Sequence, residues 1–570
     1  MTFQTAPTTS QLFANYNALV LLPEIILTVF AMIVLLSGAI LRFETQKRVL
    51  PFLALLAVGL ASVATAGLWN QNAVFGPPAS AIYAADNFSL FFKWIFLIGL
   101  GVSVLLSGRF LEARSGDKGG VAGEYLGLMM FATVGMMMVA GARDLLVVFL
   151  GIETLSIALY VLAGFARTRL MSNEAALKYF LLGAFASGFL LYGIALMYYS
   201  LGSTHLPTIT RVLETTGATS QPILLVGVAL VLIGLGFKAA LVPFHQWTPD
   251  VYEGSPTPVT AFMATGAKAA AFAALMRVFG EALAPLAPQT HSFLLVLSVL
   301  TMTVGNIIAI SQNSLKRMLA YSSISHAGYL LIGLLAAITA SHRGQDDSAA
   351  RSIAGVLFYL LCYALMNLGA FAVLIYLENM RGTRLGRNEM VRVEGVTTVG
   401  AQRGGDDAED GNLLVSDLNG LGWREPFLAA ALAVFLLSLA GIPPLAGFFG
   451  KLVIFQEAVI QGFWGLILVA VVNTVISMWY YLRPIIAMYS GDESTLGVSD
   501  DVLPSSIGSA SLRANALGGD ATVTAPRAAA IPVGALVAIV ICGVAVLSMF
   551  VLQTAALQWA QEAATSFIGR

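Results

Sequence analysis

Long apolar runs separated by short polar segments make up most of this chain. Fourteen runs approach or exceed about 20 residues, the length that crosses the hydrocarbon core of a lipid bilayer. They lie at about residues 18–41, 49–68, 88–108, 124–142, 145–165, 174–200, 222–253, 257–279, 291–312, 318–339, 352–378, 426–460, 462–489 and 530–553. The pattern predicts an all-α polytopic membrane protein with about 14 transmembrane helices.

Two of these runs are too long for one straight transmembrane helix. The runs at 222–253 and 426–460 carry helix breakers near their middle: Gly234, Gly236 and Pro243 in the first, and the stretch "GIPPLAGFFGK" in the second. Such residues indicate two half-helices joined by unwound backbone. Interrupted helices at corresponding places of two halves are typical of inverted-repeat transporters.

The order of the runs therefore predicts four parts. We expect three transmembrane helices within 1–120, a first repeat within 121–285, a second repeat within 286–490, and a loop with the last helix within 491–570. Each repeat has five spans, with the broken helix in fourth place. An odd number of spans forces the two repeats into opposite orientations.

The positive charges between the runs predict the orientation. Nineteen Lys and Arg residues fall in loops that follow odd-numbered spans, against six on the opposite side. Cytoplasmic loops carry the excess of cations, so the odd-numbered loops are expected in the cytoplasm and both termini on the other side. The long loops at about 379–425 and 490–529 then form cytoplasmic inserts.

Composition agrees with a membrane protein and excludes several functions. Of 570 residues, 58% are hydrophobic and only 11% charged, and mean hydropathy is +0.83. The net charge of −1 comes without a basic stripe, so we expect no nucleic-acid partner. The two cysteines, Cys362 and Cys542, lie in apolar runs, and the five histidines lack metal-ligand spacing. No metal, cofactor or redox centre is therefore expected in this chain.

Five lysines lie within or at the edge of the predicted spans: Lys93, Lys178, Lys238, Lys268 and Lys451. Lysine can release its proton when desolvated, whereas arginine stays charged. Lys268 lies at the centre of its span, where a charge is costly and marks an ion path; the alternative is a lysine that bonds carbonyls of a neighbouring helix. Lys238 and Lys451 lie in the broken helices, where capping a helix C-terminus is the alternative.

The other two lysines have plainer interpretations. Lys93, beside Trp94, is expected to extend to the membrane interface. Lys178 follows Glu174 in the favourable i,i+4 order, which fits either an interfacial ion pair or a relay position. Glu24 near a span start is expected to stabilise the helix N-terminus.

One acid and two histidines complete the candidate path. Glu153 lies in mid-span with no cation within four residues, so it must bind a proton or find a partner on another helix. A carboxylate beside Lys238 would raise the proton affinity of the lysine, and its removal would lower it. His245 and His326 are possible relays, with ordinary hydrogen-bonded histidines as the alternative.

Three motifs carry a resemblance to a known family. The stretches "GLGFKAALVPFHQWTPDVYEGSPTPV", "LKRMLAYSSISHAGY" and "SLAGIPPLAGFFGK" resemble the antiporter-like membrane subunits of proton-pumping NADH:quinone oxidoreductase, complex I (NDH-1), over about residues 120–485. Within that family, "HQWTPDVYEGSPTPV" is similar to the N-type subunits. M-type subunits have a glutamate where Lys451 stands, and L-type subunits continue into a long lateral helix.

The resemblance implies a function and a set of partners. It implies that Glu153 and Lys238 form a switching pair, that Lys268 is the central relay, and that Lys451 faces the exit. It implies that quinone, flavin and iron–sulfur clusters bind in partner subunits, which include an M-type neighbour, small K- and J-type subunits and a hydrophilic redox arm. The expected location is the inner membrane of a bacterium.

Other functions remain open at this point. The main alternative is the D-type subunit of a multisubunit cation/proton antiporter, or its relative in a membrane-bound hydrogenase. A structural spacer is a further alternative, although buried ionisable residues argue against it because apolar residues would be less costly there. A standalone solute transporter would need a polar substrate pocket that the sequence does not suggest.

Overall fold

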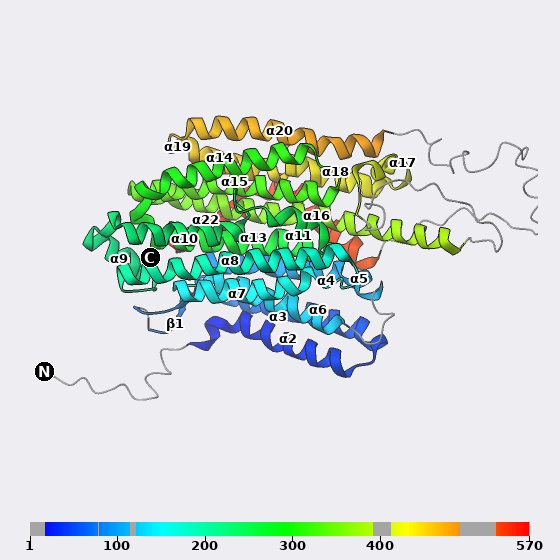
Figure 1. The fold of residues 1–570 in the computed structure, drawn as a ribbon, viewed down its shortest axis with the longest axis horizontal. Coiled ribbons are helices and arrows are strands. Elements are labelled where there is room, and N and C mark those ends of the chain that lie inside the picture. Colours follow the sequence, from blue (N-terminus) through cyan, green and yellow to red (C-terminus); the bar gives the residue numbers. More distant parts are fainter. Residues whose placement is uncertain (1–16, 78, 114–120, 391–411, 491–531, 569–570) are drawn as a thin grey trace, which may run out of the picture.

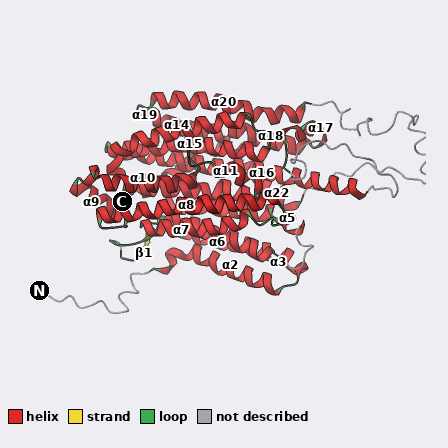
Figure 2. Ribbon diagram, viewed as in Figure 1, coloured by secondary structure: helices red, strands yellow, loops and turns green. Residues whose placement is uncertain are grey.

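The computed structural model describes residues 17–77, 79–113, 121–390, 412–490 and 532–568. Within these ranges the chain forms one bundle of long helices that run side by side (Figure 1). A short two-stranded hairpin is the only sheet among the described residues, and helix dominates the rest (Figure 2).

In chain order, the elements of the described residues form three groups. The first group is η1 (Ala18–Leu21), α2 (Leu22–Ile40), α3 (Phe43–Gly67), β1 (Ala73–Phe75), β2 (Tyr83–Ala85), α4 (Asn87–Leu106) and α5 (Gly108–Ala113). The second is α6 (Ala122–Gly141), α7 (Leu145–Ala163), α8 (Leu170–Leu201), α9 (Leu206–Thr216), η2 (Ala218–Ser220), α10 (Pro222–Ala239), α11 (Trp247–Gly254), α12 (Thr257–Phe262), η3 (Met263–Ala267), α13 (Lys268–Leu275), η4 (Met276–Ala282) and η5 (Ala284–Leu286). The third is α14 (Ala287–Ile310), α15 (Leu315–His342), α16 (Asp346–Met390), η7 (Val415–Leu418), α17 (Leu421–Arg424), α18 (Pro426–Ala440), α19 (Ala446–Ile460), α20 (Trp464–Tyr489) and α22 (Val533–Ile568).

The prediction of an all-α polytopic membrane protein is confirmed. Thirteen helices among the described residues are long and apolar enough to cross a membrane. The remaining expected run, 426–460, consists instead of α18 and α19, which are shorter helices of 15 residues each. The expected count of about 14 thus differs from the observed 13 long helices because this run is divided.

Burial separates the centre of the bundle from its rim. The apolar part of α16 is completely buried, and α15 is nearly so, whereas only a third of the corresponding part of α8 is buried. Large apolar side chains such as Phe185 on α8 and Val551 on α22 are therefore exposed, by 71% and 76% respectively. An exposed apolar rim suits the hydrocarbon of a bilayer, so α15 and α16 form the interior against which the other helices pack.

Two helices end beside the predicted breakers, and the interpretation of each as half of one broken transmembrane helix stays a prediction. Helix α10 ends at Ala239, Ala240 adopts a left-handed φ of 59°, and α11 begins only at Trp247. Helix α18 ends at Ala440, where Gly441 has a φ of 88°. The helix α12–η3–α13–η4 continues without a break but contains two π-helical turns, which occur often at functional sites. The inverted relation of the repeats and the domain boundaries at 120, 285 and 490 stay predictions.

The loops fall at two ends of the bundle. The hairpin strand β1, helix α9 and the C-terminal end of α22 lie toward one end, while α5 and α17 lie toward the other (Figure 1). We call the first the β1 end and the second the α17 end. Loops that follow even-numbered spans thus lie at the β1 end, and loops that follow odd-numbered spans lie at the α17 end. These are the two groups of loops whose Lys and Arg residues were counted above. Which end faces the cytoplasm stays a prediction.

The last helix is longer than the sequence pattern predicted. The run was expected at 530–553, but α22 continues to Ile568. Its extra turns are held by aromatic contacts to α4: the ring of Trp559 lies 4.4 Å from that of Phe91, and Phe567 lies 4.5 Å from Phe88. Packing on α4 therefore stabilises the C-terminal turns of α22, which are less hydrophobic than the turns before them.

Candidate functional site

Lys238 lies in the last turn of α10, just before the first interruption. Its side chain is buried, and its Nζ donates a hydrogen bond to the hydroxyl of Tyr160 on α7 at 3.1 Å. The same Nζ lies 5.0 Å from the Tyr160 ring centroid and 5.3 Å from that of Tyr179 on α8. Electron-rich aromatic faces thus surround the ammonium in place of water.

Glu153 lies on α7, seven residues before Tyr160, and is half-buried. Its carboxylate accepts a hydrogen bond from the hydroxyl of Ser187 on α8. No carboxylate of the described residues lies within 4 Å of Lys238 Nζ, so the expected Glu153–Lys238 pair is not in direct contact. The two groups interact electrostatically over a longer distance. Tyr160 is the side chain that contacts Lys238 on the helix of Glu153.

Sequence patterning does not single out Tyr160, and a glycine explains its position. A Cβ at Gly183 on α8 would overlap the Tyr160 hydroxyl, so only glycine lets the tyrosine lie across the helix interface. The ring packs edge-on against Tyr179, which stacks on Trp247 of α11 at 4.5 Å. The available signal is that Tyr160 lies two turns after Glu153 on the same face of α7, but an aromatic residue in an apolar run is usually a core residue.

Lys268 begins α13 directly after the π-helical turn η3 and is 2% exposed. Its Nζ donates to both the backbone carbonyl and the hydroxyl of Ser323 on α15, and it lies 5.5 Å from the ring of Tyr363 on α16. A lysine that only anchors a neighbouring helix would bond one of its backbone carbonyls, and Lys268 makes such a bond with Ser323. The Ser323 hydroxyl and the face of the Tyr363 ring are further contacts of Lys268 that such a structural role does not need.

His326 lies between the two C-terminal lysines of the candidate path. It is 2% exposed, and its ring nitrogens face two tyrosine hydroxyls: Nδ1 is 2.5 Å from that of Tyr359, and Nε2 is 3.0 Å from that of Tyr481. A neutral imidazole donates at one nitrogen and accepts at the other, so both contacts can be satisfied at once. Both Lys268 and Lys451 act on it electrostatically.

Lys451 lies in the second turn of α19, just after the second interruption. Its Nζ donates to the carbonyl of Ala440, the last residue of α18, at 3.0 Å, so it also caps that half-helix. The ammonium lies 4.9 Å from the ring centroid of Tyr329, and that ring lies 6.0 Å from His326. Tyr363, which faces Lys268, lies 5.2 Å from His326 on its other side. Lys268, His326 and Lys451 are therefore joined by two shared aromatic rings.

His245 and Lys178 lie apart from this row. His245 is in the segment between α10 and α11, and its buried Nδ1 has no hydrogen-bond partner within the described part of the chain. Lys178 is 40% exposed and pairs with Glu174 at 2.5 Å and with Asp250 at 2.8 Å. Asp250 in turn binds Arg317, which makes Lys178 part of an ion-pair network between α8, α11 and α15.

Several charged residues are more buried than the sequence suggested. The expectation that Lys93 extends to the interface is wrong, because its side chain is completely buried and its Nζ lies 2.8 Å from Glu24 Oε1. Arg277, counted as a loop cation, is likewise completely buried and binds both carboxylate oxygens of Asp86. Lys316, also counted in a loop, is 1% exposed. Partners on distant helices, which sequence spacing does not show, make this burial possible.

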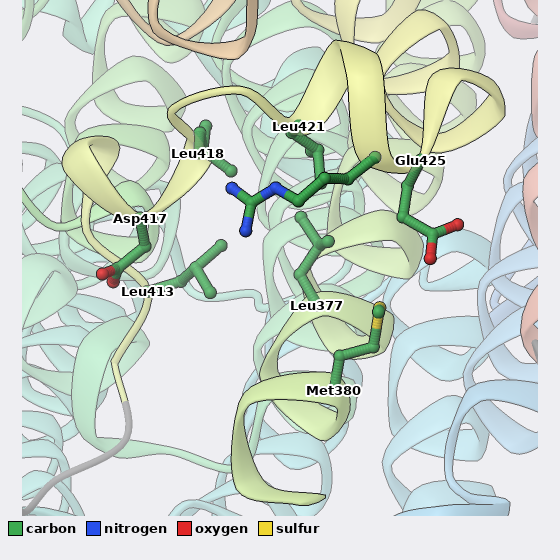
Figure 3. Close-up of a pocket in the computed structure, with 8 residues that line it drawn as sticks. Leu377, Met380, Leu413, Asp417, Leu418, Leu421 and Glu425 are labelled. Atoms are coloured by element: carbon green, nitrogen blue, oxygen red, sulfur yellow. The ribbon is translucent and has the colours of Figure 1, made fainter. Parts of the chain in front are cut away.

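A cavity of about 200 Å³ lies at the α17 end, away from the row (Figure 3). Its lining is mainly apolar and comprises Leu377, Met380, Leu413, Asp417, Leu418, Leu421, Arg424 and Glu425. None of the candidate path residues belongs to it. Among the described residues, no group of three or more His, Cys, Asp or Glu side chains could hold a metal ion.

Comparison with known proteins gives consistent matches over most of the chain. The family model described as NADH:quinone oxidoreductase/Mrp antiporter, TM, matches residues 142–400 and 405–477. NADH-quinone oxidoreductase subunit N of Trichlorobacter lovleyi is 42% identical over 480 residues, which cover 84% of this chain and 89% of that protein. NADH-quinone oxidoreductase subunit N 1 of Herpetosiphon aurantiacus is 43% identical over 470 residues, covering 82% and 86%.

Solved structures share the fold. A chain of respiratory complex I from Thermus thermophilus with bound aureothin is 34% identical, has a TM-score of 0.66, and the match covers 94% of this chain and 98% of that one. A chain of the Mrp complex from a Dietzia species has a TM-score of 0.72 with 21% identity, covering 96% and 99%. At that identity the second likeness concerns the fold alone.

Proposed function

We propose, because this chain belongs to the NADH:quinone oxidoreductase/Mrp antiporter family as a subunit N of NADH-quinone oxidoreductase, that it moves protons across the membrane. In this proposal the chain is a subunit of a proton-translocating enzyme, and quinone reduction in other subunits drives the transfer. The chain itself contributes Glu153, Lys238, Lys268 and Lys451 as the groups that bind and release protons.

The observation that carries the proposal is the row from Lys268 through His326 to Lys451. No carboxylate of the described residues lies within 4 Å of either lysine, so each charged form bears a desolvation cost that no counter-ion offsets. Two lysines and a histidine in one low-dielectric row repel each other when all are protonated. A proton that arrives at one end therefore favours release at the other.

Glu153 and Lys238 would control how protons reach this row. Tyr160 can accept a hydrogen bond from Lys238 and donate one in turn, so it can pass a proton as well as hold the ammonium in place. The charge of Glu153 favours the protonated lysine, and at more than 4 Å with an effective dielectric constant near 20 this attraction is below about 4 kcal/mol. A few kcal/mol suffices to change proton occupancy by orders of magnitude.

The proposed setting follows the family. Partners are other subunits of the complex, and we propose an M-type neighbour and small K- and J-type subunits in the membrane, with the hydrophilic redox arm acting at a distance. Flavin, iron–sulfur clusters and quinone would bind in those partners. The proposed location is the inner membrane of a bacterium, with both termini on the non-cytoplasmic side.

The alternative is a D-type subunit of a cation/proton antiporter or of a membrane-bound hydrogenase. The fold is compatible with it, since the Mrp chain superposes as well as the complex I chain does. Relatives at about 42% identity are named subunit N, which favours the quinone-linked complex. Co-purification with flavin- and iron–sulfur-containing subunits separates the two, because an antiporter would purify without them.

Lys268 provides the decisive experiment. Lys268→Ala should leave the complex assembled but lower proton pumping per quinone reduced by at least about tenfold, which corresponds to roughly 1.4 kcal/mol. Lys268→Arg should not restore pumping, because a guanidinium retains its proton. Lys47→Ala, at an exposed ion pair on α3, is the matched control. Normal pumping by the arginine variant would show that position 268 needs only a fixed charge and would contradict the proposal.

A further inference from the structure

A buried acid–base cluster lies among helices α2 and α4 and strand β2, and the proposed proton row does not include it. Lys93 Nζ lies 2.8 Å from Glu24 Oε1, and the hydroxyl of Tyr83 donates a hydrogen bond to the same oxygen. The side chain of Lys93 is 0% exposed and that of Glu24 is 7% exposed. We call Glu24, Tyr83 and Lys93 the N-terminal cluster.

The hydrogen bonds of the N-terminal cluster are incomplete. The second carboxylate oxygen, Glu24 Oε2, is buried without a hydrogen-bond partner within the described residues. Lys93 Nζ, besides its ion pair with Glu24, lies 5.5 Å from the centroid of the Tyr83 ring and has no further hydrogen-bond partner among those residues. A carboxylate accepts up to about four hydrogen bonds and an ammonium donates three. A buried ion pair that is left under-satisfied does not favour folding over an apolar replacement. Stability alone therefore does not account for these three residues.

The neighbouring charged groups do not fill the open position. Arg277 on η4 faces the cluster but donates to both oxygens of Asp86, at 2.8 and 2.7 Å, and also to Glu281 at 3.1 Å. Helix α6 contributes the backbone carbonyl of Met137, 3.3 Å from the Tyr83 hydroxyl. Asp86 and Arg277 are bonded to each other, and Glu24 Oε2 remains a buried acceptor without a hydrogen-bond partner among the described residues.

A polar cavity at the β1 end lies close along the same helix. It has a volume of about 670 Å³ and is lined by Asn70, Asn72, Val74, Asn87, Arg143, Glu562, Thr565 and Ser566. Asn87, the first residue of α4, precedes Lys93 by six residues, which is about 9 Å along a helix. Of the cluster, Lys93 therefore lies about two helical turns along α4 from a residue that lines a space whose walls suit water.

We propose that the N-terminal cluster is a second proton-binding site, at which Glu24 Oε2 accepts a proton from the cavity at the β1 end. In the step, an O–H bond forms at Oε2 with a proton delivered by water, while Lys93 and Tyr83 keep their own protons. The net charge of the cluster rises from zero to one. The site is separate from the row of Lys268 and Lys451, and it depends on the proposed function only for its use in pumping.

The test is an infrared pH titration of the whole purified complex without NADH, so that no turnover occurs. A protonated carboxyl has a carbonyl stretching band that a carboxylate lacks. Because exposed carboxyls also protonate on acidification, the band of Glu24 is sought in the difference between the native complex and Glu24→Gln. We expect one such band in that difference, and we expect it to persist in Glu24→Asp, which keeps a carboxyl. Glu44→Gln, which removes an exposed carboxyl that pairs with Lys47, should leave the band of Glu24 in place.

A double variant separates loss of the carboxyl band from loss of assembly. Glu24→Gln leaves Lys93 as a lone buried cation and can impair assembly, so the double variant Glu24→Gln/Lys93→Met removes both charges together. The double variant should assemble and lack the band. Identical titrations of the native complex and of the assembled variants that carry glutamine at position 24 would overturn the proposal. Because the spectra require no pumping, this outcome is independent of the Lys268 experiment.

Discussion

Tyr160 is the residue whose role the structure makes most specific. Tyr160→Phe removes the hydroxyl that accepts the hydrogen bond from Lys238 at 3.1 Å, while the ring and its packing against Tyr179 remain. A hydrogen bond to a charged group is worth roughly 1.5–3 kcal/mol. If that loss falls on proton transfer through Lys238, the rate decreases by about 10- to 150-fold.

A second variant displaces the same hydroxyl without removing it. A methyl group at Gly183 would occupy the position of the Tyr160 hydroxyl, so Gly183→Ala must shift the tyrosine away from Lys238. The two changes act on one contact, and Gly183→Ala should therefore cost little more once Tyr160 is phenylalanine. The assay is NADH-driven acidification of reconstituted vesicles, normalised to quinone reduction, with assembly checked on native gels.

The control is a matched substitution elsewhere in the bundle. Tyr125 on α6 is also completely buried, and its hydroxyl accepts from Ser107 at 3.1 Å rather than from a lysine. Tyr125→Phe should leave pumping within about twofold of native, as expected for a neutral hydrogen bond away from the path. Equal pumping by Tyr160→Phe and Tyr125→Phe would refute the role given to the Tyr160 hydroxyl.

Two further predictions concern the switch and the orientation. Glu153→Gln and Lys238→Met should each lower pumping, and the double variant should be no worse than the poorer single one, with a coupling of roughly 1–3 kcal/mol in a double-mutant cycle; additive losses would show that the residues act separately. Asp347→Cys, at the β1 end, should react with an impermeant thiol reagent added outside intact cells, and Ser416→Cys, near α17, should not. Both positions are exposed and both native cysteines are buried, so reversed labelling would contradict the orientation inferred from the loop charges.

Hydrophobic patterning predicts the long helices, and glycine and proline residues within two of the runs indicate helix ends there. A run of about 20 apolar residues has one stable state in a bilayer, because an unpaired backbone group there is costly. The same cost makes an internal lysine conspicuous, which is why Lys238, Lys268 and Lys451 could be named without coordinates. The breakers around Gly441 likewise predict the end of α18, since backbone preference is a local property.

The contacts of each charged group were decided by tertiary structure. Lys268 bonds Ser323, 55 positions along the chain, and Lys93 pairs with Glu24 from another helix. Nothing in local sequence distinguishes a lysine that extends to the interface from one that is buried with a partner. For this reason the expectation that Lys93 extends to the interface is wrong. The same limit hid the Tyr160 hydroxyl, which contacts Lys238 only because Gly183 lets two helices approach.

Local sequence thus determined which segments are helical and which residues are costly to bury, because both follow from the transfer of single groups from water. Helix packing determined which of those residues meet, because a side-chain contact depends on the relative rotation and depth of two helices. His326 shows the difference: its two tyrosine partners and its place between Lys268 and Lys451 come from four different helices. A proton path is a property of such distances, which no single segment of the chain contains.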